Sequence, residues 1–494
     1  MNSELVASTR KYCDSLTKYS RRKTREVYIG DVPLGGDNPI RVQSMTTVDT
    51  MDTEGSIEQT IRMVEAGCEY VRITAPSLKE AQNLQEIKKG LRARGYDVPL
   101  IADIHFTPNA AELAAKIVEK VRVNPGNYAD KKKFQQIEYT DDTYQAELDR
   151  IREKFTPLVK ICKEHGTAMR IGTNHGSLSD RIMSRYGDTP LGMVESALEF
   201  LRICEDLNYY DIVLSMKASN TQVMVQAYRL LVNKLEEEGL QPYPLHLGVT
   251  EAGEGEDGRI KSAVGIGTLL EDGLGDTVRV SLTEEPEEEA PVAQIMVDRY
   301  DNRADHDNIP DIENCPIDPF GYEKRNTREV VNVGGQHVPR VIADLSGIEL
   351  DNYKDLKAIG HFYLPELDKW KMNDLGADYI YSGKNPVPFM LPNGLKEILD
   401  HAAWLPHQDK KNKIPLFDVD SYQIAEKKHE AINFLQVELK DLSEALLDRI
   451  EADPSLVLLL HTTNKHGYAE QRRAFFTLIE ANIDVPVIIK RKYN

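Results

Sequence analysis

The feature that most constrains the fold is a regular alternation of short apolar runs and helical stretches between Ile40 and Thr283. Seven steps carry the chain from Arg41 to Arg279, 238 residues later, which is 34 residues per step. A strand, a turn and a crossover helix need roughly 30 residues. The period therefore predicts eight strands: Ile40–Met45, Tyr70–Ala75, Pro99–His105, Val121–Asn124, Thr167–Asn174, Asp211–Ser219, Leu245–Glu251 and Thr277–Thr283.

The stretches between these runs are predicted to be helices, among them Ser56–Ala66 and Pro108–Glu119. Pro108 suits the first position of a helix because its fixed φ is already helical. Parallel strands covered by helices are buried on both faces, which explains why the runs are continuously apolar. Eight β/α units with none left over favour a closed (β/α)₈ TIM barrel over residues 26–300. An open, doubly wound α/β sheet is the alternative.

Composition excludes several classes of protein. The chain has 494 residues, enough for two or three domains, and a formal charge of −19, which argues against a nucleic-acid binder. Its apolar runs are too short to span a membrane, and residues 1–25 read as an N-terminal arm without a secretory signal. We therefore expect a cytoplasmic protein with no membrane or nucleic-acid partner. Its five cysteines form no C-x-x-C pair, which argues against a zinc site.

Basic residues interrupt five of the predicted strands. Each lies between apolar neighbours, as in Val71-Arg72-Ile73-Thr74, and the set is Arg72, Arg122, Arg170, Lys217 and Arg279. A buried cation is costly unless an anion meets it. Asp103 and Glu251 are the evident carboxylates, which leaves about three positive charges unmatched. An ion-pair layer inside the barrel accounts poorly for that surplus. A diphosphate-bearing ligand accounts for it well, because the guanidinium fork suits bidentate phosphate contacts.

Neutral and acidic groups share the same strand faces, since side chains two residues apart point the same way. Asn124 accompanies Arg122, Asn174 lies four residues after Arg170, and Ser281 accompanies Arg279. Asp103 and His105 make an incomplete metal pair, so no metal site is predicted. The segment Gly248–Gly258 reads as a loop, and the acidic run Glu284–Glu289 reads as a solvated segment.

Five segments together resemble the (E)-4-hydroxy-3-methylbut-2-enyl diphosphate synthase family over about residues 20–300. They are Gln43–Thr46, Ala102–Phe106, Arg122–Asn127, Arg170–Leu178 and Leu247–Gly253. The resemblance implies an oxidoreductase of the methylerythritol phosphate (MEP) pathway of isoprenoid (terpenoid) biosynthesis. Such an enzyme reductively opens 2-C-methyl-D-erythritol 2,4-cyclodiphosphate to (E)-4-hydroxy-3-methylbut-2-enyl diphosphate and releases water. The alternatives are another phosphate-binding barrel enzyme, such as a pterin-dependent synthase, and a non-catalytic binding homologue.

The resemblance also implies the roles of individual residues. Catalytic roles fall to Glu251, as proton donor, and to Asp103 and His105, which line the same pocket. Substrate binding falls to Arg72, Arg122, Asn124, Arg170, Asn174, Lys217, Arg279 and Ser281. Ferredoxin or flavodoxin would deliver the electrons, and the protein would be a homodimer.

One departure from the family pattern concerns its 4Fe-4S cluster. Members hold this iron-sulfur cluster on three cysteines and a glutamate of a C-terminal domain, beginning with a C-P-x-C-G-like motif. This sequence has no such motif, and Cys315-Pro316 offers a single thiol. We expect this chain to hold the substrate half of the site, to lack the cluster ligands, and to be inactive without the iron-sulfur domain.

The second half is predicted to be a separate α/β domain. Residues 301–330 read as a linker, and residues 331–494 resemble the degenerate-barrel insertion of plant-type and some bacterial members. Strands are expected at Val338–Leu345, Asp378–Ser382, Ile414–Asp420, Ile432–Leu439, Leu456–His461 and Val485–Lys490. Asp418, Asp420 and His461 are its polar groups at strand ends, expected to be satisfied within the core. We expect the domain to act as a spacer or scaffold and to end in a bare strand edge near Lys490–Asn494.

Overall fold

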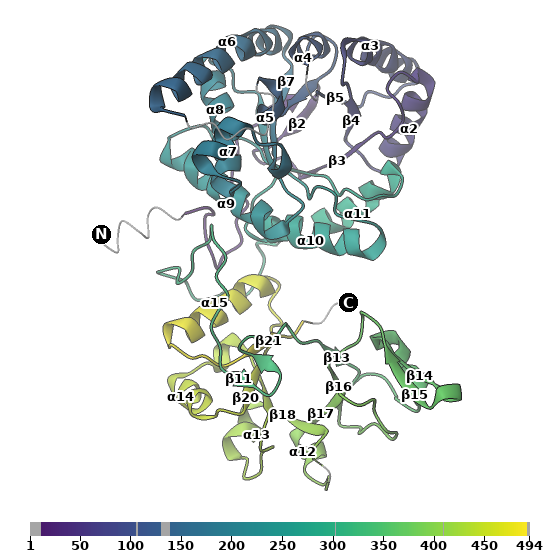
Figure 1. Ribbon diagram of the computed structural model, residues 1–494, viewed down its shortest axis with the longest axis vertical. Coiled ribbons are helices and arrows are strands. Elements are labelled where there is room, and N and C mark those ends of the chain that lie inside the picture. The colour runs from purple at the N-terminus through teal and green to yellow at the C-terminus, as the bar shows by residue number, and fades with distance from the viewer. Residues whose placement is uncertain (1–10, 105–106, 130–138, 302, 409, 492–494) are drawn as a thin grey trace. The chain divides into compact units, whose positions relative to one another are not determined.

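The computed structural model describes residues 11–104, 107–129, 139–301, 303–408 and 410–491 (Figure 1). The chain divides into two compact units. The first comprises Met1–Asp305 with Ile317–Tyr322, and the second comprises His306–Pro316 with Glu323–Asn494.

The first unit is the predicted eight-stranded parallel barrel. Its strands are β3 (Arg41–Met45), β4 (Tyr70–Thr74), β5 (Leu100–Asp103), β6 (Lys120–Val123), β7 (Ala168–Asn174), β8 (Ile212–Lys217), β9 (His246–Leu247) and β10 (Thr277–Val278). They follow the order β8-β7-β6-β5-β4-β3-β10-β9. A parallel bridge between Leu214 and Leu245 joins the two ends of this order and closes the ring. The last two strands are shorter than the sequence predicts.

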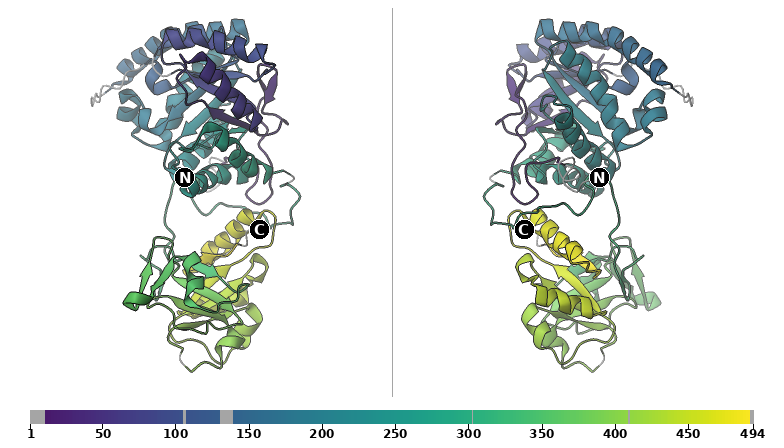
Figure 2. Two further views of the ribbon diagram at one scale, coloured as in Figure 1. Left: turned by 90° about the vertical axis from the view of Figure 1, so that its right-hand side faces the viewer. Right: turned by 90° about the vertical axis from the view of Figure 1, so that its left-hand side faces the viewer.

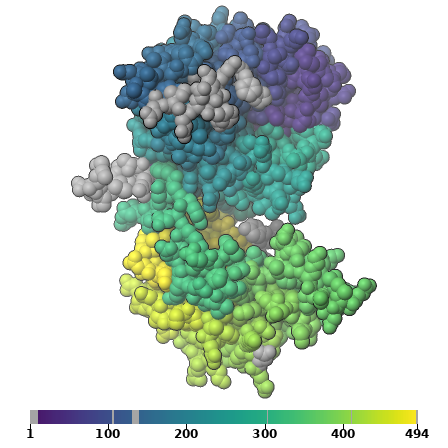
Figure 3. Space-filling model, viewed as in Figure 1, coloured from purple at the N-terminus to yellow at the C-terminus, as the bar shows by residue number. Residues whose placement is uncertain are grey.

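Helices surround these strands, as Figures 1 and 2 show. They are α2 (Thr53–Glu65), α3 (Leu78–Ala93), α4 (Pro108–Ala114), α5 (Pro125–Tyr128), α6 (Asp141–His165), α7 (Asp180–Tyr186), α8 (Pro190–Asp206), α9 (Thr221–Glu237), α10 (Gly255–Glu271) and α11 (Pro286–Asp298). Capping residues start several of them. Ser77 and Glu80 form a capping box at α3, and Asn220 accepts from two backbone N–H groups at α9. The space-filling view shows one face of this unit in purple to teal (Figure 3).

A hairpin that the sequence did not reveal plugs the N-terminal end of the barrel. It consists of β1 (Val27–Ile29) and β2 (Val32–Leu34), paired antiparallel. Its apolar side chains form a fully buried cluster with residues from the first positions of four barrel strands: Tyr70, Ile101, Ala168 and Val213. With this end closed, a ligand reaches the barrel interior at the carboxyl ends of the strands.

The second unit contains a seven-stranded parallel sheet. Its strands are β13 (Ile342–Asp344), β16 (Tyr379–Gly383), β17 (Lys396–Asp400), β18 (Lys413–Phe417), β19 (Asn433–Val437), β20 (Leu456–Leu460) and β21 (Val487–Ile489), paired in this order. The sequence analysis missed β17, whose Lys396-Glu397 start hides its apolar character. Strictly sequential order is the arrangement of an unclosed barrel, and β21 lies at one edge of the described sheet.

The remaining elements of this unit are short. Two antiparallel hairpins are β11 (Glu329–Val330) with β12 (Val333–Gly334), and β14 (His361–Leu364) with β15 (Lys369–Met372). The helices are α12 (His401–Trp404), α13 (Val419–Ile424), α14 (Glu444–Ala452) and α15 (Gly467–Glu480). The β11–β12 hairpin contributes Val330 and Val333 to the core enclosed by the sheet, as β1–β2 does in the barrel.

The β1–β2 hairpin of the first unit and the β11–β12 hairpin of the second have the same local structure, which reveals an internal repeat. Thr24-Arg25-Glu26-Val27 recurs as Thr327-Arg328-Glu329-Val330. Gly36 N–H donates to Thr24 Oγ1, and Gly335 N–H donates to Thr327 Oγ1.

The entry to the first strand repeats in the same way. Arg41 pairs with Glu69 immediately before β4, and Arg340 pairs with Asp378 immediately before β16. Arg41 Nε donates to the Pro33 carbonyl, and Arg340 Nε donates to the Asn332 carbonyl. The seven strands of the second sheet therefore correspond in order to β3–β9.

Candidate active site

A cavity of about 150 Å³ opens at the carboxyl ends of the barrel strands. Its lining comes from β3–β8 and from the segments that follow β9 and β10: Met45, Arg72, Thr74, Asp103, Arg122, Arg170, Asn174, Lys217, Val249, Thr250, Arg279 and Ser281. All five predicted cations lie here, each 7% exposed or less. The structure thus brings the five cations together on one cavity.

Asp103 neutralises part of this charge. Its two oxygens lie 3.0 Å from Arg122 Nη1 and 3.4 Å from Arg72 Nε. Arg122 also donates to the Gly172 carbonyl at 2.9 Å. Gly172 supplies the necessary space, because a Cβ at this position would lie 2.8 Å from Arg122 Nε. A carboxylate between two guanidinium groups fixes both forks before any ligand arrives.

Arg170 is the cation with the least compensation. It is 1% exposed, and its Nε and Nη1 have no hydrogen-bond partner among the described residues. Burial, followed by the charges of Arg72 and Arg122, lowers the pKa of Arg170. A guanidinium stays protonated in proteins. The free-energy cost of this buried positive charge is therefore offset by a bound anion and not by loss of a proton.

Lys217 lies on β8 beside the same cavity, where burial and then Arg170 lower the pKa of its ammonium group. Gly248 leaves room for it, since a Cβ there would come 2.7 Å from Lys217 Nζ.

Arg279 is held by a carboxylate that the sequence analysis placed in solvent. Glu289, on α11, is 2% exposed and accepts from Arg279 Nε at 3.1 Å. It also accepts from the Leu282 N–H at 3.0 Å and from the Ser44 hydroxyl. The prediction of a solvated run was wrong at Glu289, because the last residue of that run turns inward on the helix. Among the described residues, Asp103 pairs with Arg72 and Arg122 and Glu289 pairs with Arg279, so two negative charges meet the five cations and three positive charges remain.

The other predicted site residues lie as follows. Asn174 and Ser281 line the cavity. Asn124 points to the neighbouring loop, where its amide donates to Ser177 Oγ at 2.7 Å and its oxygen accepts from Gly126 N–H. Asn124 thus fastens the loops after β6 and β7 together. His105 lies outside the described residues.

Glu251 stands at the mouth of the site, directly after the cavity residue Thr250. It is exposed and adopts a left-handed backbone conformation, with φ of +50°. Such a conformation is uncommon for a residue with a Cβ and concentrates at functional positions.

The ligand set of an iron-sulfur cluster is not assembled by the described residues, which contain no group of three His, Cys, Asp or Glu side chains able to hold a metal ion. Cys13, Cys68, Cys162 and Cys204 are separately buried, and Cys315 is partly exposed. These thiols do not fit a 4Fe-4S cluster, and we derive no redox step from them. Within the described residues, no helix has the length and apolar character of a membrane span.

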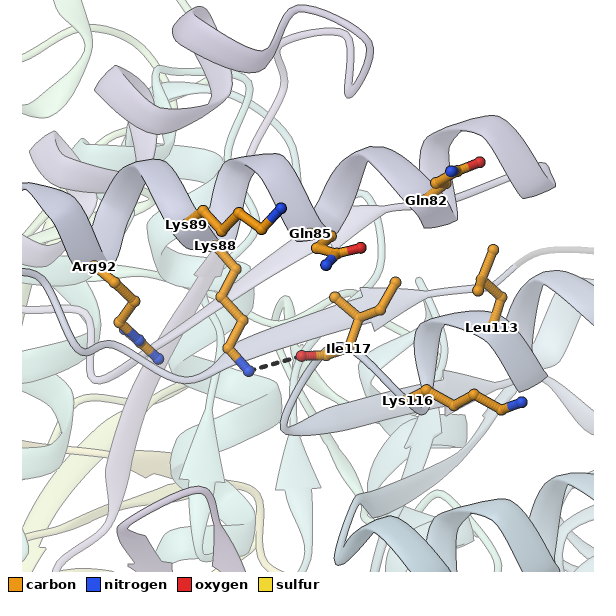
Figure 4. A pocket seen from close by; sticks show the side chains of 8 residues that line it. All are labelled: Gln82, Gln85, Lys88, Lys89, Arg92, Leu113, Lys116 and Ile117. Carbon is orange, nitrogen blue, oxygen red and sulfur yellow. Dashed lines mark hydrogen bonds between the residues drawn. The ribbon is translucent and has the colours of Figure 1, made fainter.

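A second hollow lies on the outer wall between α3 and α4 and is also basic (Figure 4). Its Lys88 donates to the Ile117 carbonyl at 2.7 Å and pairs with Glu119, which Arg92 also approaches. These cations hold the wall together and leave little charge for a ligand.

The strand ends of the second unit have lost the cationic site. By strand register, Arg122 corresponds to Leu416, Arg170 to Phe434 and Lys217 to His461. His461 pairs with Glu438 at 3.1 Å.

The two predicted aspartates of this unit are exposed, and the expectation that they are satisfied in the core was wrong. Asp418 instead caps α13 by accepting from the Ser421 N–H, and Asp420 lies in the first turn of that helix. They serve a local helix start, not a ligand.

The fold and the cavity define a (β/α)₈-barrel protein with an anion site at the carboxyl ends of its strands. The GcpE TIM-barrel domain model matches residues 24–294. The chain therefore belongs to the GcpE family. Proteins similar to it include 4-hydroxy-3-methylbut-2-en-1-yl diphosphate synthases (flavodoxin).

The similarity to such synthases extends through the second unit. The protein of Parabacteroides distasonis is 49% identical over 476 residues, which are 96% of this chain and 74% of that protein. That of Bacteroides fragilis is 48% identical over 479 residues, 97% of this chain and 73% of that protein. That of Leptospira interrogans is 59% identical over 327 residues, 65% of this chain and 49% of that protein.

Solved structures are more distant. The 7,8-dihydropteroate synthase of Vibrio fischeri covers 55% of this chain and 97% of its own, at 15% identity and a TM-score of 0.34.

Proposed function

We propose that this chain binds the cyclic diphosphate of methylerythritol and forms the substrate half of an oxidoreductase that opens its ring in isoprenoid biosynthesis. The observation that carries the proposal is Arg170, a buried guanidinium at the cavity, two of whose nitrogens have no hydrogen-bond partner in the described part of the chain. The three surplus positive charges around it are enough to neutralise the two negative charges of the cyclic diphosphate, and membership of the family indicates the reaction.

In this proposal the cations and the neutral donors have distinct tasks. Arg72, Arg122, Arg170, Lys217 and Arg279 hold the two phosphates, with Asn174 and Ser281 as neutral donors. Asn124 contributes by positioning the loop that follows Arg122.

The reacting end of the substrate would face acidic groups at the mouth. Glu251 would give a proton to the leaving oxygen, and Asp103 would hold the forks of Arg72 and Arg122 in place. His105 is proposed at the same end of the site.

Calorimetric titration of this chain with the cyclic diphosphate tests the proposal. Arg170→Ala and Arg279→Ala should each weaken binding by about 1.5–3 kcal/mol, the usual value of a hydrogen bond to a charged group. Lys116→Ala, an exposed position on the outer wall, is the matched control and should bind like the wild type. Unchanged affinity in both arginine variants would contradict the assignment of the cavity.

Catalysis is proposed to require groups beyond those described here. A 4Fe-4S cluster held outside these residues and a flavodoxin or ferredoxin donor would supply the two electrons. Turnover by this chain with a chemical reductant and no added iron-sulfur domain would contradict that division.

Three further properties are proposed from the family resemblance. They are a homodimer, a cytoplasmic location and a spacer role for the second unit. Light scattering after size-exclusion chromatography measures the first directly.

A further inference from the structure

A layer of buried polar side chains lies beneath the anion site, inside the barrel. Gln43 and Lys120 each precede a cavity residue by two positions on the same strand, namely Met45 and Arg122, and Thr277 precedes the cavity residue Arg279, which directly follows β10, by two positions. Side chains two apart share a strand face, so all three point into the barrel one step below the cavity.

His246 on β9 belongs to the same layer, two positions before Gly248. All four side chains are 1% exposed or less. Gln43 Oε1 and Nε2, Lys120 Nζ, Thr277 Oγ1 and both ring nitrogens of His246 have no hydrogen-bond partner among the described residues.

Lys120 has the least favourable surroundings for a charge. Its register neighbours on β5 and β7 are Ile101 and Ala168, both apolar. The ring of Tyr70, on β4, lies 5.0 Å from its ammonium nitrogen. The charged groups that act on Lys120 are Arg170 and Arg72, and both are cations. A charged ammonium in this position has a desolvation cost and like-charge repulsion, and among the described residues the face of the Tyr70 ring, not a carboxylate, is what offsets part of them.

We infer that Lys120 is an uncharged amine while the cavity holds no anion, and that it takes up a proton when a diphosphate binds above it. Lys120 is then a further positioning residue of the anion site, because its new charge acts on the ligand through the layer occupied by Arg170. The direction of its titration agrees with this geometry: burial, followed by Arg170 and Arg72, lowers the pKa of Lys120 well below its ordinary value. This inference rests on the proposed binding of the cyclic diphosphate.

The repulsion at Lys120 weakens when the ligand arrives. Without the ligand, Arg170 Nε and Nη1 have no hydrogen-bond partner among the described residues and Arg72 shares Asp103 with Arg122, whereas the bound phosphates place negative charge beside both guanidinium groups. An arginine at position 120 would stay charged throughout, whereas a lysine can lose its proton when buried. The proton comes from the buffer: the amine gains it, the buffer acid loses it, and no bond of the ligand breaks.

The cyclic diphosphate is a suitable probe because both of its phosphates are esterified in the ring and do not titrate near neutral pH. Any proton exchanged on binding therefore belongs to the protein. Calorimetric titration at pH 8 in three buffers of different ionisation enthalpy gives the number of protons taken up.

Lys120→Met, an apolar substitute of similar length, should reduce the uptake by about one proton relative to the wild type. The wild-type dissociation constant should rise with pH more steeply than that of the variant, by up to about tenfold per pH unit for one proton. Lys217 also lines the cavity and can contribute uptake of its own, so the difference between proteins is the decisive quantity. Lys116→Met, an exposed lysine, is the control and should leave the uptake unchanged.

The outcomes separate this inference from the proposed function. No binding by the wild type would overturn the function itself. Binding by both proteins with equal proton uptake would overturn the inference alone. Lys120→Gln repeats the measurement with a polar, non-titrating side chain, so the result does not depend on the folding of a single variant.

Discussion

At the scale of single residues, the anion site depends on glycines as much as on cations. Gly172 lies on β7 between Arg170 and Asn174, and a Cβ there would approach Arg122 Nε to 2.8 Å and Ser215 Oγ to 3.1 Å. We predict that Gly172→Ala displaces Arg122 and weakens binding of the cyclic diphosphate by about 1–3 kcal/mol.

Gly176→Ala is the matched control for this prediction. It lies in the loop that follows the same strand, and no atom lies within 4 Å of its added Cβ. Calorimetry on both variants checks the prediction, and equal affinities would show that Arg122 tolerates the methyl group.

Glu289 makes a second residue-scale prediction, on stability. It is the carboxylate paired with Arg279, and both side chains are at most 8% exposed. Removing one partner of a buried pair typically costs about 3–5 kcal/mol, so Glu289→Ala should lower the free energy of unfolding by that order. Added diphosphate should recover part of the loss, because the anion takes over the compensation of Arg279. Denaturant unfolding with and without the ligand measures both effects. A decrease in the free energy of unfolding below about 0.5 kcal/mol, as is usual for a surface substitution, would contradict the role of Glu289.

The buried amine of Lys120 predicts how stability depends on pH. Its pKa in the folded protein lies well below the ordinary 10.5. Between those two values the unfolded chain binds a proton that the folded protein does not, so this group lowers stability as the pH falls. The free energy of unfolding of Lys120→Met minus that of the wild type should therefore shrink as pH rises from 7 to 10, by up to about 1.4 kcal/mol per unit. A pH-independent difference in denaturant unfolding would contradict a neutral Lys120.

Some of these residues could be predicted from the sequence and others could not. The five cations were predicted because a charge inside an apolar strand stands out. Glu289 was missed because it ends a run of acidic residues, and only the turn of α11 shows which of them faces inward. Lys120 was missed because it begins its strand and so resembles a polar flank.

At the scale of elements, the sequence predicted the strands and closure of the barrel better than the short hairpins. Eight runs and a 34-residue period correctly predicted the barrel, since each βα unit must bury its own apolar faces. The β1–β2 and β11–β12 hairpins were not predicted, because each of their strands has two or three residues, too few for an alternating pattern to show. The repeated Thr-Arg-Glu-Val before each hairpin was the available signal.

The β1–β2 hairpin has an essential packing role. Ile29 is fully buried in the cluster that closes the N-terminal end of the barrel. We predict that Ile29→Ala lowers the free energy of unfolding by about 2–5 kcal/mol, the usual cost of truncating a core isoleucine. The exposed Tyr28→Ala is the control and should stay within about 0.5 kcal/mol. Thermal or denaturant unfolding of both variants shows whether the hairpin is part of the core or lies on the surface.

At the scale of the whole molecule, the internal repeat assigns the same structural role to two distant glycines. Gly35 and Gly334 both have positive φ, +83° and +81°, and a Cβ on either would lie against a backbone carbonyl, that of Arg25 or Arg328. Both positions also contact a proline before the seventh strand of their own unit, Pro244 or Pro486. Alanine at either position is therefore strained and should destabilise only the unit that contains it.

The repeat thus allows the two units to be perturbed separately by equivalent changes. Gly35→Ala should lower the unfolding temperature of the barrel. This is the transition whose temperature the bound diphosphate raises. Gly334→Ala should lower the midpoint of the second unit and leave the ligand-dependent transition in place, because Leu416, Phe434 and His461 stand there at the strand positions of Arg122, Arg170 and Lys217. Differential scanning calorimetry with and without the cyclic diphosphate assigns each transition to a unit. An equal shift of the ligand-dependent transition by both variants would show that the two units unfold together in one cooperative transition. The second unit would then also contribute to the stability of the anion site.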